Sequence, residues 1–163
     1  NKGWRYAKYL LEFERGGGFS APRVQHELER LQAMVDEAHH RLADFDASAD
    51  IARRIARIEI DLKALDITEL RILSAVSGGG NPGPESSILK LTTTRLEQDI
   101  NELAVDVLGY RGFEMAPVAD GIPYRSDFTA SVVPRYLNNR AASIFGGSQE
   151  VQRNIIAKLV LGL

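Results

Sequence analysis

Apolar residues recur at every third or fourth position along most of this chain, which is the spacing of one buried face of an α-helix. The pattern predicts helices over residues 4–14, 20–42, 49–77, 84–108 and 128–143, followed by a last helix after Ser148. Glycine runs at 16–18 and 78–80 separate these segments, because glycine costs backbone entropy inside a helix. Residues 109–127, rich in glycine and proline, are expected to form an ordered loop.

Strand signals are almost absent, and short polar breaks join the long amphipathic helices, so we expect an all-α, antiparallel four-helix bundle. The positions expected to face its core are Val24, Leu28, Leu31, Val35, Ala38 and Leu42; Ile51, Ile55, Ile58, Leu62 and Leu65; Leu89, Leu96, Leu103 and Val107; and Val151, Ile155 and Leu159. The segment 49–77 also carries apolar residues outside its stripe, at Ile60, Ile67, Leu70 and Leu73. A stripe that wide predicts burial of a second side by another domain or subunit.

Two residues near the C-terminus bear on helix boundaries. Pro134 either kinks the helix predicted over 128–143 or marks its true start. Ser148 follows the pair Gly146–Gly147 and is well placed to cap the last helix.

Composition narrows the classes of function. The 163 residues suit one domain with a sizeable core, and 44% hydrophobic with 26% charged residues is ordinary for a globular protein. A net charge of −2 gives no reason to expect nucleic acid or an anionic membrane as partner. The absence of cysteine excludes disulfides, thiolate metal sites and cysteine nucleophiles. The three histidines have no metal-ligand spacing with carboxylates, and we expect no metal site. No apolar run approaches the length of a membrane span.

The C-terminal run NNRAASIFGGSQEVQRNIIA, residues 138–157, carries a specific motif: an aromatic-x-Gly-Ser turn, then two polar residues, an aliphatic residue and Gln-Arg. This run resembles the signature that ends acyl-CoA dehydrogenases. Segments in the order that family shows lie upstream, at 3–15, 88–91, 102–104 and 108–113. The resemblance covers essentially the whole chain and implies one C-terminal helical domain, residues 1–163, of a larger dehydrogenase. The family's N-terminal helical and middle β-domains would lie outside this sequence, which opens without methionine.

What the resemblance implies is FAD-dependent α,β-desaturation of an acyl-CoA, with FAD held between the middle domain and this bundle. Electrons would pass to an electron-transfer flavoprotein or a similar acceptor. The family assembles through this domain, so a homo- or hetero-oligomer, dimer or tetramer, is expected. A cytoplasmic location fits the lack of cysteine, although that lack excludes no compartment.

The resemblance also assigns a catalytic base. Many family members place it directly after the signature's aromatic residue, where this chain has Gly146, which offers no proton acceptor. A second subgroup places a glutamate before an arginine on the first helix of the domain, and Glu14–Arg15 matches that arrangement. We therefore expect Glu14 as base, with Arg15 and Phe145 at the substrate. The alternative for Glu14 is a solvated residue at a helix end.

For the cofactor, the resemblance implies contact of the adenine end of FAD with Leu108, Gly109 and Gly112, although a glycine there also suits a simple helix C-cap. Ser148 and Glu150 match cofactor-contacting positions of the signature, while helix capping would explain the serine equally well. The linker at 41–48 lacks the Arg-x-x-Phe-Gly motif with which many members hold the FAD phosphate of the other subunit.

Gly146 and the missing motif favour a rival hypothesis, a non-catalytic structural subunit of a heteromeric dehydrogenase. A flavin oxidase built on the same fold is a third possibility.

Overall fold

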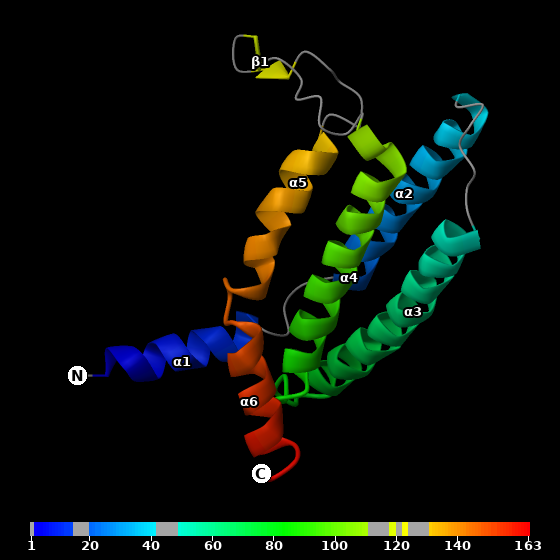
Figure 1. The fold of residues 1–163 in the computed structure, drawn as a ribbon. Helices are drawn as coiled ribbons and strands as arrows, with labels where there is room; N and C mark the ends of the chain where they lie inside the picture. Colours follow the sequence, from blue (N-terminus) through cyan, green and yellow to red (C-terminus); the bar gives the residue numbers. More distant parts are fainter. Residues whose placement is uncertain (1, 15–19, 42–48, 111–117, 120–121, 124–130) are drawn as a thin grey trace.

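The computed structural model describes residues 2–14, 20–41, 49–110, 118–119, 122–123 and 131–163 (Figure 1). Its helices are α1 (Gly3–Glu14), α2 (Ser20–Arg41), α3 (Ala49–Ser77), α4 (Ser86–Leu108), α5 (Val132–Asn139), the 3₁₀ helix η3 (Arg140–Ser143) and α6 (Gln149–Leu159). Two strands of two residues each, β1 (Val118–Ala119) and β2 (Ile122–Pro123), pair antiparallel. The all-α prediction is thus confirmed, apart from this small hairpin within the predicted loop 109–127.

Three long helices, α2, α3 and α4, pack against one another and enclose the main core (Figure 1). Their fully buried apolar side chains are Val24, Leu28, Leu31, Leu65, Leu96 and Leu103. All six were expected on the buried stripes, because the 3.6-residue repeat returns them to one face of each helix. A Leu or Ile held this deep contributes about 1.5–3 kcal/mol relative to an exposed one.

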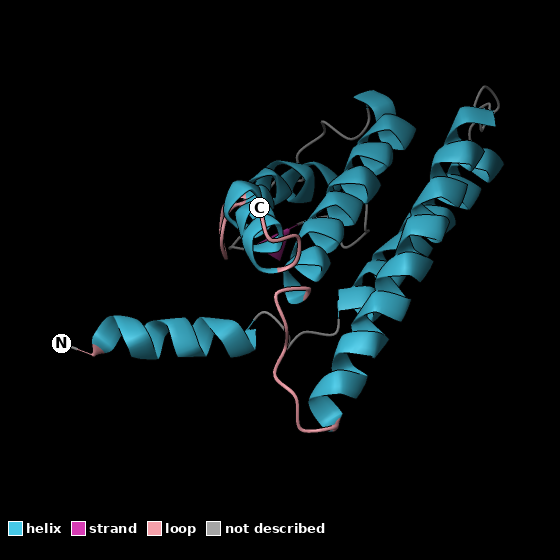
Figure 2. Ribbon diagram, turned by 90° about the horizontal axis from the view of Figure 1, so that it is seen from below, coloured by secondary structure: helices cyan, strands magenta, loops and turns pink. Residues whose placement is uncertain are grey.

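The helix α4 lies at the centre of the domain. On its other side it packs against α5, η3 and α6, so it lies between α2 and α3 and the C-terminal segments (Figures 1 and 2). The helix α5 begins at Val132, which places Pro134 in the first turn, where a missing N–H costs no hydrogen bond. Of the two alternatives for Pro134, the structure supports the one in which proline marks the start.

The inward face predicted for α6 was partly wrong. Val151 and Leu159 are exposed, while Gln152, between the expected positions, is buried. The face that packs on α4 is set by the approach of α6 after the Gly146–Gly147 turn, and the apolar spacing alone did not report it.

The helix α1 projects away from the bundle (Figures 1 and 2). Its side chains Trp4, Tyr6, Tyr9 and Leu10 are all exposed. On α3, the predicted second apolar face is also exposed in this chain, at Ile60, Ile67 and Leu70. Both surfaces leave apolar area uncovered. No helix in the described ranges is both long enough and apolar enough to span a membrane.

A carboxylate of α3 caps the N-terminus of α2. The backbone N–H of Ser20 donates to Oε1 of Glu69 over 2.7 Å, and the N–H of Ala21 donates to Oε2 over 3.0 Å. Glu69 is 4% exposed. The first N–H groups of a helix have no partner within it, and their dipoles favour an anion, so Glu69 satisfies both needs from a neighbouring helix.

Candidate functional site

A cavity of about 490 Å³ lies between the start of α2, the first half of α4 and the C-terminal turn that leads into α6. Its apolar lining comes from Leu89, Ala142, Phe145, Val151 and Ile155. Its polar lining comes from Ser20, Arg23, Lys90, Thr93, Thr94, Glu97, Asn139 and Gln152. A volume of a few hundred Å³ and a combination of apolar walls with convergent polar groups are typical of small-molecule sites.

Lys90 of α4 spans the cavity wall toward the C-terminal turn. Its Nζ donates to the carbonyl oxygen of Ala142 over 2.7 Å and lies 5.1 Å from the centroid of the Phe145 ring. Burial lowers the pKa of Lys90, against the opposing charge of Glu97. The carbonyl dipole and the ring face together replace part of the water that this ammonium has lost.

Glu97, two helical turns beyond Lys90 on α4, has a nearly buried carboxylate that lines the same cavity. Its Oε1 lies 2.5 Å from the guanidinium of Arg23 on α2, whose side chain is 61% exposed. Burial raises the pKa of Glu97, and the charge of Arg23 acts in the opposite direction. A parallel ion pair joins Glu27 of α2 to Arg135 of α5 over 2.5 Å. These two ion pairs therefore tie α2 to α4 and to α5 beside the cavity.

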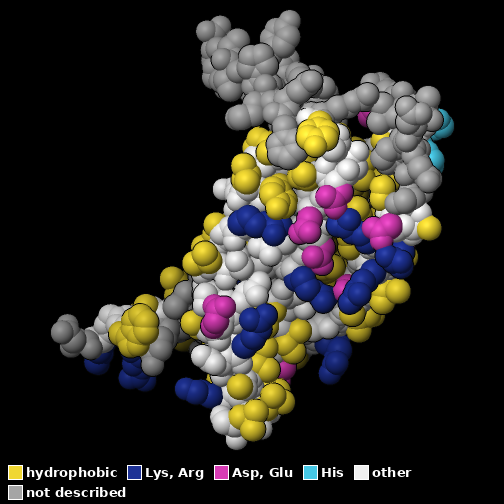
Figure 3. Space-filling view, viewed as in Figure 1, with side chains coloured by type: hydrophobic (Ala, Val, Ile, Leu, Met, Phe, Trp, Pro, Cys, Tyr) yellow, Lys and Arg dark blue, Asp and Glu magenta, His cyan; other side chains and the backbone are white. Residues whose placement is uncertain are grey.

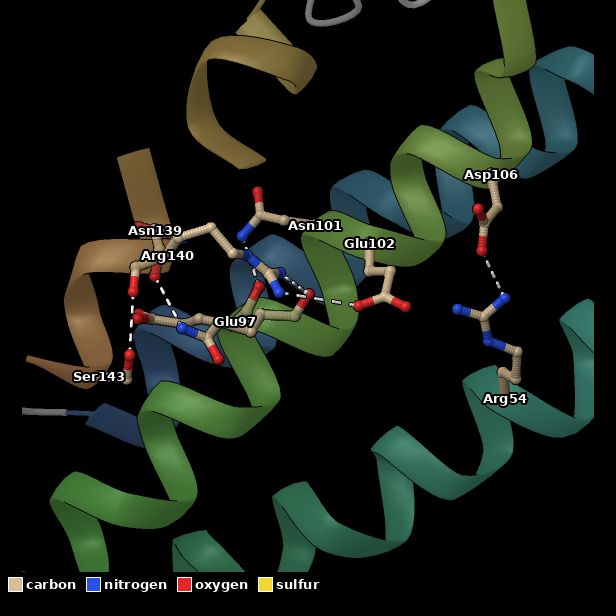
Figure 4. Close-up of polar contacts among 9 residues, drawn as sticks. Arg54, Glu97, Asn101, Glu102, Asp106, Asn139, Arg140 and Ser143 are labelled. Atoms are coloured by element: carbon tan, nitrogen blue, oxygen red, sulfur yellow. Dashed lines mark hydrogen bonds and ion pairs between the residues drawn. The ribbon is translucent and has the colours of Figure 1, made fainter. Parts of the chain in front are cut away.

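Further polar contacts of α4 hold its neighbours in place (Figure 4). On the cavity side, the Gln98 side chain donates to the carbonyl oxygen of Asn139 over 2.8 Å, which fixes the junction of α5 and η3. On the opposite side, Arg54 of α3 pairs with Asp106 over 2.6 Å. The Gln98 contact helps to hold the segment that carries Ala142 and Phe145, and the Arg54 pair joins α3 to α4.

Acidic and basic side chains also alternate over the face where α3 and α4 meet (Figure 3). A smaller hollow of about 320 Å³ lies there, lined by Arg54, Arg57, Asp61, Arg95, Asp99 and Glu102 among others. Arg95 pairs with Asp61 over 2.8 Å across the hollow. Burial raises the pKa of Asp99, against the charge of Arg95. The ion pairs between α3 and α4 explain the charged lining of this hollow, because they hold the two helices together.

The cavity brings together two residues of the signature turn, of which Phe145 was predicted to lie at the substrate. Phe145 lines it and is 57% exposed. Gly146 lines it too, at φ +66°, and the nearest atom to a Cβ built there is Nζ of Lys90 at 3.8 Å. The position that holds the base in many family members is therefore open in this chain, with a cation beside it.

The structure leaves the predicted base untested. Glu14 is the last residue of α1, but its side chain lies outside what the structure describes, as do Arg15 and Gly112. The predicted catalytic assignment thus stays a prediction.

The predicted cofactor contacts lie at two separate helix ends. Leu108 is half-buried against the core at the end of α4, and Gly109 caps that helix at φ +52°, with open space where a Cβ would be. Ser148 is the N-cap residue of α6, as predicted, but its hydroxyl makes no capping hydrogen bond. The pKa of Glu150, a fully exposed residue, is lowered by a hydrogen bond from its own backbone N–H and by one from Ser148.

Sequence reasoning missed the polar residues of the cavity. Thr93 Oγ1 and Gln152 Oε1 are buried without a hydrogen-bond partner in the described part of the chain. Thr93 and Glu97 lie in a helix that reads as an ordinary amphipathic segment, and no motif marks them; Lys90 falls in the segment 88–91 that resembles the family, but nothing in the sequence gave it a role. Within the described ranges, no group of three or more His, Cys, Asp or Glu residues could hold a metal ion.

Comparison with known proteins supplies the context for this geometry. Residues 1–161 match the family model described as the acyl-CoA dehydrogenase C-terminal domain. The acyl-CoA dehydrogenase IpdE1 of Mycobacterium tuberculosis is 33% identical over 161 residues, which cover 99% of this chain and 38% of that protein. The chain therefore spans about two fifths of that relative's length.

Two solved structures share the fold. The Tcur3481–Tcur3483 steroid ACAD superposes with a TM-score of 0.75 at 20% identity, over 99% of this chain and 40% of that one. The structure of PigA with FAD and proline gives a TM-score of 0.69 at 20% identity, over 94% and 37% of the two chains.

Proposed function

This chain belongs to the acyl-CoA dehydrogenase family, as its C-terminal helical domain, and from that premise we propose that it serves FAD-dependent α,β-desaturation of an acyl-CoA thioester. It would do so as part of a larger dehydrogenase that also holds an N-terminal helical and a middle β-domain. The observation that carries the proposal is the cavity of about 490 Å³, because the signature turn at Phe145–Gly147 forms part of its wall.

Two exposed groups fit a dinucleotide cofactor. Gly109, with no atom within 4 Å of where a Cβ would stand, allows close approach of a flat ring at the end of α4. The exposed Glu150 carboxylate, at the start of α6, can accept a hydrogen bond from a hydroxyl or N–H of the cofactor. Its negative charge makes the same helix end a poor place for the pyrophosphate. FAD, when bound, supplies the acceptor for the hydride that leaves the β-carbon.

The chain's own residues would bind the acyl group and move one proton. The apolar walls at Phe145, Val151 and Ile155 would exclude water from the thioester's acyl part. Glu14 would remove the proton from the α-carbon, and an apolar setting would bring its pKa nearer the operating pH. An electron-transfer flavoprotein or similar carrier would then reoxidise the enzyme.

The test is Glu14→Gln in the intact dehydrogenase, which removes the proton acceptor and keeps the side chain's shape. Turnover of acyl-CoA with an artificial electron acceptor should fall by at least ~10²-fold. The flavin spectrum should not change, because the proposed cofactor contacts lie at Gly109 and Glu150. Glu12→Gln, two residues earlier on α1, is the matched control and should retain turnover.

The second candidate function is a structural subunit whose partner carries the base. The observation that favours it is Gly146 with Lys90 beside it, a cation where many family members have a carboxylate. Near-normal turnover of Glu14→Gln would support this candidate and remove the first assignment.

Assembly is part of either proposal. The exposed apolar side chains Ile60, Ile67 and Leu70 on α3 fit the interface between subunits, homo- or heteromeric, as a dimer or tetramer. Light scattering that gives a monomer of the intact protein at micromolar concentration would contradict it.

A further inference from the structure

Two of the segments that carry the family resemblance, 88–91 and the C-terminal signature, meet in space. Residues 88–91 lie on α4, about fifty positions before the C-terminal signature, and Lys90 is their point of contact with it. Three parts of the signature surround its ammonium group. The carbonyl oxygen of Ala142 accepts its hydrogen bond at 2.7 Å, the Phe145 ring centroid lies at 5.1 Å, and a Cβ at Gly146 would lie at 3.8 Å.

We propose that Lys90 is a positioning residue that clamps the turn Phe145–Gly147 as the wall of the substrate cavity. The inference rests on the proposed function. Gly146 and Gly147 both adopt positive φ. Because both are glycines, neither has a side chain that could fix the turn. The backbone gives it only local support, through the N–H groups of Ile144 and Phe145, which both donate to the carbonyl oxygen of Ala141.

The clamp acts across the turn rather than along it. From α6, the Gln152 side chain donates to the carbonyl oxygen of Gly146 over a long 3.4 Å. From α4, Lys90 holds the residue three positions before Phe145 and the Phe145 ring itself. No ion pair joins Lys90 to a carboxylate in the described part of the chain. Glu97, on the same helix, is paired with Arg23 instead. The cation is therefore committed to the turn and not to an ion pair.

Lys90 is buried enough for these contacts to count. Lys90 is half-buried, and because its ammonium has given up part of its water there, burial lowers its pKa. A hydrogen bond from a charged donor and a partly desolvated cation–π contact together make the turn's position depend on one side chain. Loss of Lys90 would loosen the wall of the cavity and leave Glu14, on another helix, unchanged.

The experiment compares Lys90→Met, Lys90→Arg and Lys63→Met in the intact dehydrogenase. Methionine keeps the length of the lysine side chain and removes its charge, arginine keeps the charge and the donors, and Lys63 is an exposed residue of α3 that serves as control. Hydrogen exchange measures the amides of Ile144 and Phe145, and steady-state kinetics with acyl-CoA measure kcat and KM separately.

We expect Lys90→Met to speed exchange at Ile144 and Phe145 by about tenfold and to raise KM by a similar factor, with kcat changed less than about threefold. Lys90→Arg should restore most of both, and Lys63→Met should change neither. If Lys90→Met only reduced the fraction of folded protein, the apparent kcat would fall while KM stayed constant. That result would overturn the proposal. Unchanged exchange at the turn in Lys90→Met would overturn it as well.

The exchange measurement also separates this inference from the proposed function. If the intact protein desaturates no acyl-CoA but Lys90→Met still releases the turn, the clamp stands and the proposed function fails. If turnover is normal and the turn is unaffected, the reverse holds.

Discussion

Replacing Glu69 tests how much a buried carboxylate on one helix stabilises the start of another. In Glu69→Ala the N–H groups of Ser20 and Ala21 lose acceptors at 2.7 and 3.0 Å; the first hydrogen bond is partly buried and the second is buried. Each hydrogen bond to a charged group contributes about 1.5–3 kcal/mol, and the helix dipole adds up to ~2 kcal/mol. The desolvation of the carboxylate offsets part of this sum. We expect a net loss of about 3 kcal/mol.

Glu69→Gln should cost less, about 1 kcal/mol, because its amide oxygen can still accept one of the two hydrogen bonds. The assay is urea unfolding followed by far-UV circular dichroism, with the slope of the transition unchanged. In thermal unfolding, Glu69→Ala should lower the Tm by roughly 10 °C for a chain of this size.

The control is Glu59→Ala on the same helix. Glu59 also accepts a hydrogen bond from α2, from the Gln32 side chain over 2.8 Å, but it is exposed. Such a surface contact contributes less than about 0.5 kcal/mol. If Glu69→Ala proves no more destabilising than Glu59→Ala, the carboxylate does not act as a cap for α2 and the reasoning is refuted.

Other changes have equally definite outcomes. Burial raises the pKa of Glu97, so its carboxyl group binds a proton more tightly in the native state than in the unfolded chain. The protonated group therefore stabilises the fold at pH values below its ordinary pKa. That stabilisation is lost as the pH rises through the pKa of Glu97 in the native state. Urea titrations between about pH 4 and 8 should therefore show a flatter decline in Glu97→Gln; an unchanged slope would contradict the burial. Gly147→Ala should destabilise more than Gly146→Ala, because both adopt positive φ but only at Gly147 would a Cβ come within 2.5 Å of Gln152 Nε2. Calorimetric Tm values in the reverse order would count against this turn geometry. Thr93→Val should raise the free energy of unfolding by up to about 1 kcal/mol, since it removes a buried hydroxyl without a partner; destabilisation would mean that the hydroxyl is satisfied.

The helices were predictable from sequence because their signals are local. The apolar repeat and the break at 78–84 placed α3 at Ala49–Ser77 and α4 at Ser86–Leu108 almost to the residue. The cavity was only partly predictable. The signature pointed to Phe145 and Gly146, but Lys90 and Glu97 have roles set by residues some fifty and seventy positions away in sequence.

Two misses have the same physical origin. Gln152 is buried where Val151 and Leu159 were expected, because the direction of a chain leaving two glycines is set by packing on α4 and not by periodicity. The carboxylate of Glu69 reads in the sequence as one more charged helix residue, and only its encounter with Ser20 shows its use. Glu14 remains a prediction, which the kinetic test above will decide.

Because α1 projects from the bundle, it determines what the intrinsic tryptophan fluorescence of this chain can report. Trp4 is the sole tryptophan in the sequence, and it sits 72% exposed on a helix that stands away from the bundle (Figure 2). Its fluorescence should already be red-shifted in the native chain and should change little when the core of α2, α3 and α4 unfolds. The same indole would respond strongly to any surface that covers α1. Trp4 is thus a poor probe of folding and a built-in sensor of docking.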